Sequence, residues 1–153
     1  MSAAGAGRLT PPLADLVADF AALTERDRLQ LLLELSRELP DLPERLFGQR
    51  EAMEPVPECQ SPVFLLVEVE PDGLTRVFFD VPVEAPTTRG FAAVLSEGLD
   101  GQPAEAVLAV PDDLPFELGL TAAVSPLRLG GMAGMLRRIK RQTAEKSAGQ
   151  AGA

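Results

Sequence analysis

VFLLVEVE (residues 63–70), PDG (residues 71–73) and LTRVFFDV (residues 74–81) follow one another in the middle of the chain. The two outer runs are rich in β-branched and aromatic residues, which are the residue types enriched in strands. The Pro-Asp-Gly between them is a turn signal, because each of these residues favours a backbone conformation that turns use. We therefore predict an antiparallel hairpin over residues 63–81.

Helical patterns precede this hairpin. Thr10 is a suitable N-cap for a first helix, with Pro11 in the first turn and apolar residues at three- and four-residue spacing after it. Thr24, with Asp27 three residues later, predicts the cap of a second helix that stops at Pro40. We expect these two helices to form a helical hairpin.

Helical patterns also follow the hairpin. Thr87 or Thr88 is the expected cap of a helix that stops at Gly98. Further apolar patterns predict two short helices and one strong helix, near residues 103–109, 116–124 and 129–143. The predicted fold class is α+β, a single two-layer domain with N-terminal helices, a small antiparallel sheet and C-terminal helices.

The domain is expected to span residues 10–143, between flexible tails at residues 1–9 and 144–153. The tails consist mostly of small and polar residues. Within the domain, residues 41–62 lose helical periodicity and contain four prolines, which disfavour a continuous helix. This loop carries Cys59.

Composition excludes several classes of function. The chain has 153 residues and a formal charge of −9, which repels phosphate backbones, so we expect no nucleic-acid partner. Its apolar runs are shorter than the roughly 18 residues of a membrane span, and the start of the chain has no apolar secretory core, so we expect no membrane partner and a cytoplasmic location. Residues 132–153 contain five basic residues and one acid, so the rest of the chain has a formal charge of −13. We interpret this basic cluster as a solvated helix end.

The counts of histidine and cysteine limit the chemistry further. Histidine is absent, which excludes the usual general base and the commonest transition-metal ligand. Cys59 is the single cysteine, so the chain cannot form an internal disulfide or a thiolate cage for a metal or cluster. We expect no metal and no cofactor in this chain, and any thiol chemistry must be completed by another molecule.

Two interpretations of Cys59 are open. A lone cysteine is usually a buried small hydrophobe, but prolines bracket this one in a polar loop just before the hairpin, where a thiol can be presented. Glu58 disfavours the thiolate by charge repulsion, whereas Arg89, Arg128 or turn N–H groups could stabilise it. The chemistry of a thiol depends on this balance, since the thiolate is the nucleophile.

The loop and its surroundings resemble a known family. Residues 56–65, including Cys59-Gln60-Ser61, resemble the Cys-Gln-Ser motif of the SufE family and the hydrophobic strand that follows it. The resemblance covers about residues 10–143. It continues at residues 28–35, Glu38-Leu39-Pro40, Thr88-Arg89-Gly90-Phe91, Ser125-Pro126-Leu127-Arg128 and Gly131-Met132. The sequence departs from the family pattern at Glu58, where many members have Gly, at Phe64, where many have Trp, and at Leu127, where many have Ser.

The resemblance implies a function. Cys59 would accept sulfur as a persulfide from a SufS-like, PLP-dependent cysteine desulfurase, stimulate that enzyme and pass the sulfur to a scaffold for iron–sulfur cluster assembly, with PLP on the partner. It further implies a thiol that rests in an apolar cavity and swings out when the desulfurase docks. Gln60 and Ser61 would support the site as part of the motif, with Glu58, Glu84, Arg89 and Arg128 as further candidates.

Two other classes of function compete with this one. In the first, the chain is an acidic, non-covalent interaction domain with an inert cysteine. In the second, it is a self-sufficient sulfurtransferase of the rhodanese kind, although the loop around Cys59 shows no evident run of backbone donors for a substrate anion. Alkylation of the thiol and turnover of thiosulfate would separate the three.

Overall fold

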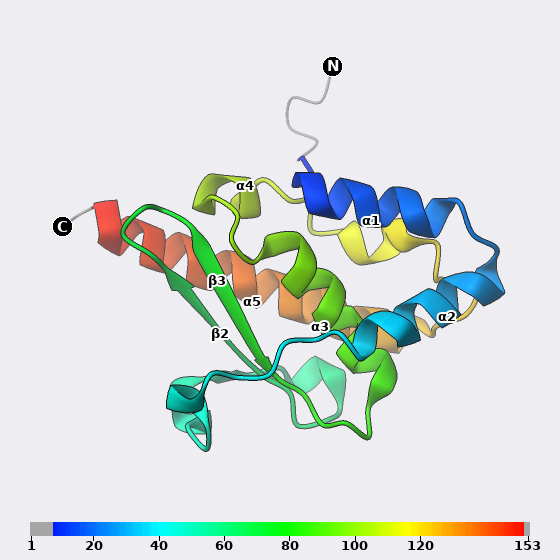
Figure 1. Ribbon diagram of the computed structural model, residues 1–153, viewed down its shortest axis with the longest axis horizontal. Helices are drawn as coiled ribbons and strands as arrows, with labels where there is room; N and C mark the ends of the chain where they lie inside the picture. Colours follow the sequence, from blue (N-terminus) through cyan, green and yellow to red (C-terminus); the bar gives the residue numbers. More distant parts are fainter. Residues whose placement is uncertain (1–7, 152–153) are drawn as a thin grey trace.

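The computed structural model describes residues 8–151 (Figure 1). Its regular elements are, in chain order, α1 (Pro11–Ala21), α2 (Glu25–Ser36), η1 (Glu44–Leu46), η2 (Arg50–Ala52), β1 (Glu54–Pro55), η3 (Pro57–Cys59), β2 (Phe64–Val69), β3 (Thr75–Asp80), α3 (Pro86–Leu99), α4 (Ala104–Leu108), η4 (Leu114–Leu118) and α5 (Pro126–Ala151), where η marks a short 3-10 helix. Helices at both ends of the chain enclose a small antiparallel sheet, so the predicted α+β class is confirmed. No helix in the described part of the chain is both long enough and apolar enough to cross a membrane.

The sheet has the order β1-β2-β3, and the predicted hairpin forms its larger part. β2 and β3 pair in register from Phe64 opposite Asp80 to Val69 opposite Thr75. Along β2, buried side chains alternate with partly exposed ones, as expected for a strand with one face on the core. Helix α5 packs against β2 and α3 against β3, which gives the two layers seen in Figure 1.

The N-terminal helices begin where the sequence predicts. The hydroxyl oxygen of Thr10 accepts a hydrogen bond from the N–H of Leu13 at 3.2 Å, and that of Thr24 accepts from Asp27 at 3.3 Å. The Thr10 hydroxyl also donates to the carbonyl of Gly98 at 2.6 Å, which joins α1 to α3. Both predicted caps are confirmed.

The predicted limits of α3 are wrong at both ends. The helix begins at Pro86, before either threonine, because proline is well suited to the first turn of a helix. Gly98 lies inside α3 instead of stopping it. A Cβ at Gly98 would lie 2.2 Å from Cδ2 of Leu13, so glycine is needed there for the close packing of α1 on α3.

The predicted flexible tails are corrected where the structure describes them. Helix α5 continues through residues 144–151, because the alanines and the charged and amide residues there are good helix formers. Lys146 Nζ donates to the carbonyl of Val67, and Gln142 Oε1 accepts from the N–H of Val67 at 2.8 Å, so α5 covers part of an edge of β2 that the short β1 leaves open. At the other end, the N–H of Arg8 donates to Ala109 at 2.7 Å; residues 1–7 and 152–153 lie outside the described residues.

Candidate functional site

Cys59 is the last residue of η3, in the turn that joins β1 to β2. The turn is closed by backbone hydrogen bonds from Cys59 to Val56 and from Gln60 to Pro57, both at 3.1 Å. Gln60 has a φ of 60°, a left-handed conformation that is uncommon outside glycine. The sequence folds locally in this way because Pro57 suits the start of a helical turn and the left-handed residue then ends it.

This turn packs against helix α5 at two glycines. The thiol of Cys59 donates to the carbonyl of Gly131 with an Sγ–O distance of 3.6 Å. A Cβ at Gly131 would lie 3.1 Å from Sγ and 3.2 Å from Cα of Cys59, and a Cβ at Gly134 would lie 2.9 Å from the carboxyl carbon of Glu58. The absence of side chains at these positions therefore lets η3 lie directly on the helix.

The surroundings of the thiol favour its protonated form. Cys59 is half-buried, and burial, followed by the charge of Glu58, raises the pKa of the thiol from its ordinary value of 9.0 to about 11, against a smaller opposing effect of Arg138. At neutral pH such a thiol is ionised in on the order of one molecule in ten thousand. The resting thiol is sheltered and a poor nucleophile.

Glu58 points toward α5 and forms ion pairs there. Its carboxylate lies 3.0 Å from Arg138 and 3.4 Å from Arg137. Burial pushes the pKa of Glu58 up, but the hydrogen bond from Arg138 and the charges of both arginines outweigh burial and hold the pKa below its ordinary value. Glu58 is thus a carboxylate at neutral pH and is tied to the helix.

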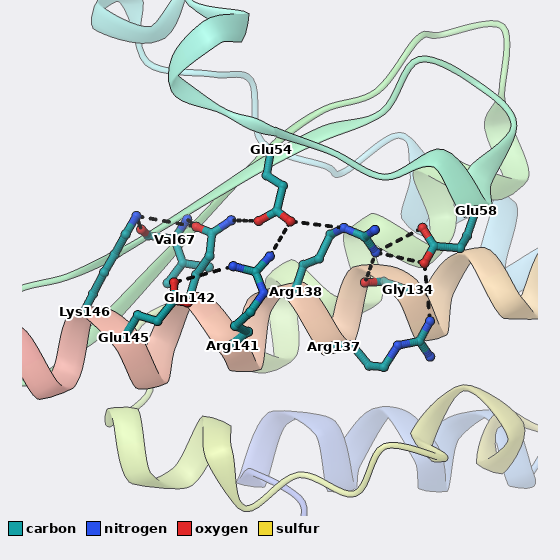
Figure 2. A network of polar contacts seen from close by, with 10 residues as sticks. All are labelled: Glu54, Glu58, Val67, Gly134, Arg137, Arg138, Arg141, Gln142, Glu145 and Lys146. Carbon is teal, nitrogen blue, oxygen red and sulfur yellow. Dashed lines mark hydrogen bonds and ion pairs between the residues drawn. The ribbon is translucent and has the colours of Figure 1, made fainter.

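Figure 2 shows that this pair belongs to a longer polar network along α5. Arg138 Nε lies 3.3 Å from Glu54 Oε2, so one guanidinium contacts a carboxylate of β1 and a carboxylate of η3. Glu54 also pairs with Arg141 and accepts from Gln142 Nε2 at 2.9 Å. The segment from β1 to η3 is therefore fastened to one face of α5.

An open groove of about 620 Å³ runs beside this network. It is lined by four basic and three acidic side chains, namely Arg137, Arg138, Lys140, Arg141, Glu54, Glu58 and Asp112. Four of the five basic residues that the sequence suggested to be a solvated helix end line this groove, and three of them, all arginines, hold acids of the Cys59 segment. That interpretation is corrected: the cluster is part of the site.

The other predicted site residues lie in different places. Gln60 and Ser61 belong to the turn, where the carbonyl of Ser61 accepts from Val63 at 2.7 Å. Arg89 Nη1 donates to the carbonyl of Val81 at 2.8 Å, which fixes the end of β3, and the side chains of Arg128 and Glu84 are exposed. Of the cations in the described chain, Arg138 is the one whose charge acts on the thiol.

Sequence reasoning missed Gly134 and Arg138. Together with Gly131 they have the spacing i, i+3 and i+7, which places them on one face of a helix. A glycine pair followed by a cation on a predicted helix was the available signal. Within residues 8–151, no group of three or more His, Cys, Asp or Glu side chains is arranged to hold a metal ion.

Comparison with protein families gives one match that spans most of the chain. The model of the SufE family, described as an Fe-S metabolism associated domain, matches residues 14–143. The matched region contains the Cys59 turn and the glycines of α5 that receive it.

Individual relatives agree with this match. The chain is 56% identical over 137 residues to an uncharacterized SufE-like protein of Mycobacterium tuberculosis, covering 90% of this chain and 94% of the relative. It is 34% identical over 115 residues to the sulfur acceptor protein CsdE of Escherichia coli, covering 74% and 75% of the two chains. The solution structure of a hypothetical protein from Thermus thermophilus superposes with a TM-score of 0.80 at 37% identity, covering 91% and 98%.

Proposed function

Because this chain belongs to the SufE family, we propose that it is a sulfur acceptor of iron–sulfur metabolism in which Cys59 carries the sulfur as a persulfide. The donor is a SufS-like, PLP-dependent cysteine desulfurase, and the acceptor is a scaffold for cluster assembly. A similar protein of Escherichia coli carries the name sulfur acceptor protein. We place this exchange in the cytoplasm, where reducing conditions keep a lone thiol free.

The proposed transfer needs no added oxidant or reductant. The thiolate of Cys59 attacks the terminal sulfur of the donor's persulfide, so a new S–S bond forms on Cys59 while the donor's S–S bond breaks. The donor cysteine leaves as a thiolate and takes up the proton that Cys59 gave up. A second exchange, with a thiol on the acceptor, returns Cys59 to its starting state.

The observation that carries the proposal is the placement of the only cysteine of the chain. Cys59 lies on a short turn, half-buried against α5, with its Sγ held at 3.6 Å from the carbonyl of Gly131. A shelter of this kind protects a bound persulfide from stray thiols. It also requires the turn to leave α5 before the thiol can ionise and attack.

Intact-mass measurement tests the proposal. The protein is incubated with a PLP-dependent cysteine desulfurase and free cysteine, and the mass of each chain is then recorded. We expect added mass equal to one or more sulfur atoms, lost on reduction with dithiothreitol and absent from a Cys59→Ser control. Stimulation of the desulfurase by both proteins alike, with no added sulfur, would instead favour the non-covalent interaction domain.

A further inference from the structure

Arg138 holds the segment that carries Cys59 at two points. Its Nη1 lies 3.0 Å from Glu58, next to the thiol, and its Nε lies 3.3 Å from Glu54, at the start of the segment. Nη1 also donates to the carbonyl of Gly134 at 3.1 Å, which fixes the direction of the guanidinium on its own helix. In Figure 2 the Arg138 side chain lies between the two carboxylates.

The position of Glu58 makes this contact specific to the turn. Glu58 directly precedes Cys59, and the two residues lie on Gly134 and Gly131, one helical turn apart on α5. A carboxylate held at Glu58 therefore holds the neighbouring thiol on Gly131 as well.

We propose that the Glu58–Arg138 ion pair is a latch that keeps the Cys59 turn closed on α5, with Arg138 as a positioning residue for the thiol. The proposal rests on the proposed function for its biological use, because a sulfur acceptor must expose the thiol to its donor. While the pair is closed, Cys59 stays sheltered and protonated. When it opens, the thiol is exposed to solvent and can ionise.

The latch can be reached from outside the domain. The side chains of Arg138 and Glu58 are 20% and 35% exposed, and both line the open groove. An ion pair of this exposure exchanges with outside anions more readily than one sealed in a core, where each charge is costly to release. Arg137, which is 55% exposed and lies 3.4 Å from Glu58, offers a second cation to an approaching acidic group.

Loss of Arg138 separates the latch from a simple charge effect, because the two predict opposite signs. The positive charge of Arg138 favours the thiolate, so removing only that charge makes the thiol less acidic and slows its alkylation. Opening the turn removes the burial that is the main cause of the raised pKa, so it makes the thiol more acidic and speeds alkylation.

The test measures alkylation of Cys59 by iodoacetamide as a function of pH in the isolated protein. For Arg138→Met we expect alkylation about tenfold faster near neutral pH, equivalent to one pKa unit, and a lower apparent pKa. Lys140→Met is the matched control, because Lys140 lies on the same helix and lines the same groove but pairs with Asp112 instead of Glu54 or Glu58. Slower alkylation of Arg138→Met, or equal rates for the two variants, would overturn the latch.

A double-mutant cycle shows whether Glu58 and Arg138 act through their contact. Glu58→Gln also alkylates faster, and the double variant should be less fast than the product of the two single effects. If the two single effects multiply in the double variant, the residues act independently and the latch is contradicted. If Arg138→Met does not fold, Glu58→Gln alone still tests the proposal, because an alkylation rate equal to that of wild type would overturn it. Arg138→Lys, which keeps the charge but not the two-sided contact, should fall between wild type and Arg138→Met.

This test uses no sulfur donor, so its result is independent of the proposed function. A protein that takes up no sulfur but shows the expected alkylation rates keeps the latch and loses the sulfur-acceptor function. A protein that takes up sulfur on Cys59 but alkylates at the same rate in all variants keeps the function and loses the latch.

Discussion

The two turns at the ends of β2 are held in different ways. The hairpin turn is closed mainly by its own residues: Gly73 donates to Glu70 at 2.8 Å, Asp72 accepts from the N–H of Leu74 at 3.1 Å, and Gly73 has a φ of 87°. A long-range backbone hydrogen bond also reaches this turn, from the N–H of Ala104 to the carbonyl of Gly73, at 3.0 Å. The Cys59 turn has local backbone hydrogen bonds as well, but its position on α5 depends on Gly131, Gly134 and Arg138, more than 70 residues away.

This difference has a functional consequence. A turn whose contacts are local stays formed as long as its strands are paired. A turn that depends on a distant helix can leave that helix while the strands stay paired, since local opening costs less than global unfolding. The same strand therefore carries one fixed end, which keeps the sheet in register, and one end that is suited to present a thiol.

The largest expected effect concerns chemistry that only the Cys59 turn has. Cys59→Ser should abolish sulfur acceptance and keep the fold, because the hydroxyl is close to the thiol in size but is hardly ionised at neutral pH, and the chain has no histidine to deprotonate it. Intact mass after incubation with a desulfurase measures the loss, and circular dichroism checks the fold. Sulfur uptake by the serine variant would show that Cys59 is not the acceptor.

A second prediction concerns the surface that receives the Cys59 turn. In Gly131→Ala the added Cβ would lie 3.1 Å from Sγ and 3.2 Å from Cα of Cys59, so the turn must shift away from the helix by a few tenths of an ångström. We expect the alkylation of Cys59 to be about tenfold faster, because a less buried thiol has a lower pKa and a fall of one unit has this effect. Gly130→Ala is the matched control, because its Cβ meets nothing within 4 Å and both variants gain helix propensity equally. Equal rates would contradict this role of Gly131.

The raised pKa of Cys59 predicts a pH dependence of stability. The pKa of the folded-state thiol, about 11, lies above its ordinary value of 9.0, so the stability that the neutral thiol contributes is complete below pH 9 and is lost as the pH rises through 11. Wild type should lose about 1 kcal/mol relative to Cys59→Ser over this range, after allowance for exposure of the thiol. Urea unfolding at pH 8 and pH 10.5 measures the gap, and an unchanged gap would contradict the shift.

A fourth prediction tests the hairpin turn. Gly73→Ala places a Cβ at a φ of 87°, which should destabilise the domain by about 1 kcal/mol, although no atom lies within 4 Å of the new Cβ. Alkylation of Cys59 should be unchanged, because this turn makes no contact that holds η3. A changed alkylation rate at unchanged stability would show that β2 couples the two turns.

The same contrast explains how much the sequence predicts. The hairpin and the caps at Thr10 and Thr24 follow from residues close together in the chain, and they are confirmed. The resemblance to the SufE family indicates the loop of Cys59. It also includes Gly131, which contacts that loop, in the Gly131-Met132 correspondence. Reliance on local patterns also explains the wrong end predicted for α3. Gly98 looks like a helix stop in the sequence, but it is there because α1 packs closely against α3.

The missed features depend on long-range contacts. The acids that Arg138 pairs with, Glu54 and Glu58, are on a different segment, and its local contact is with a backbone carbonyl, that of Gly134. The sequence could show a basic cluster but not which acids it meets. The predicted flexible tail after residue 143 is wrong for two reasons: its residues are good helix formers, and its contact with β2 is invisible in a stretch that offers almost nothing apolar.

The smallest expected effect lies between the two turns, on the strand that they share. Lys146 donates to the carbonyl of Val67 on β2, and burial lowers the pKa of its ammonium group. Lys146→Met keeps most of the side-chain packing but removes the donor, so we expect a loss of about 0.5–1 kcal/mol, the net worth of one partly exposed hydrogen bond. Urea unfolding measures this loss against Arg26→Met, which removes an exposed charge from α2. Because Lys146 contacts the strand and neither turn, alkylation of Cys59 should match wild type. Stability equal to that of Arg26→Met would show that the end of α5 does not hold the edge of β2, and faster alkylation would show that the Cys59 turn depends on that edge as well as on Gly131 and Arg138.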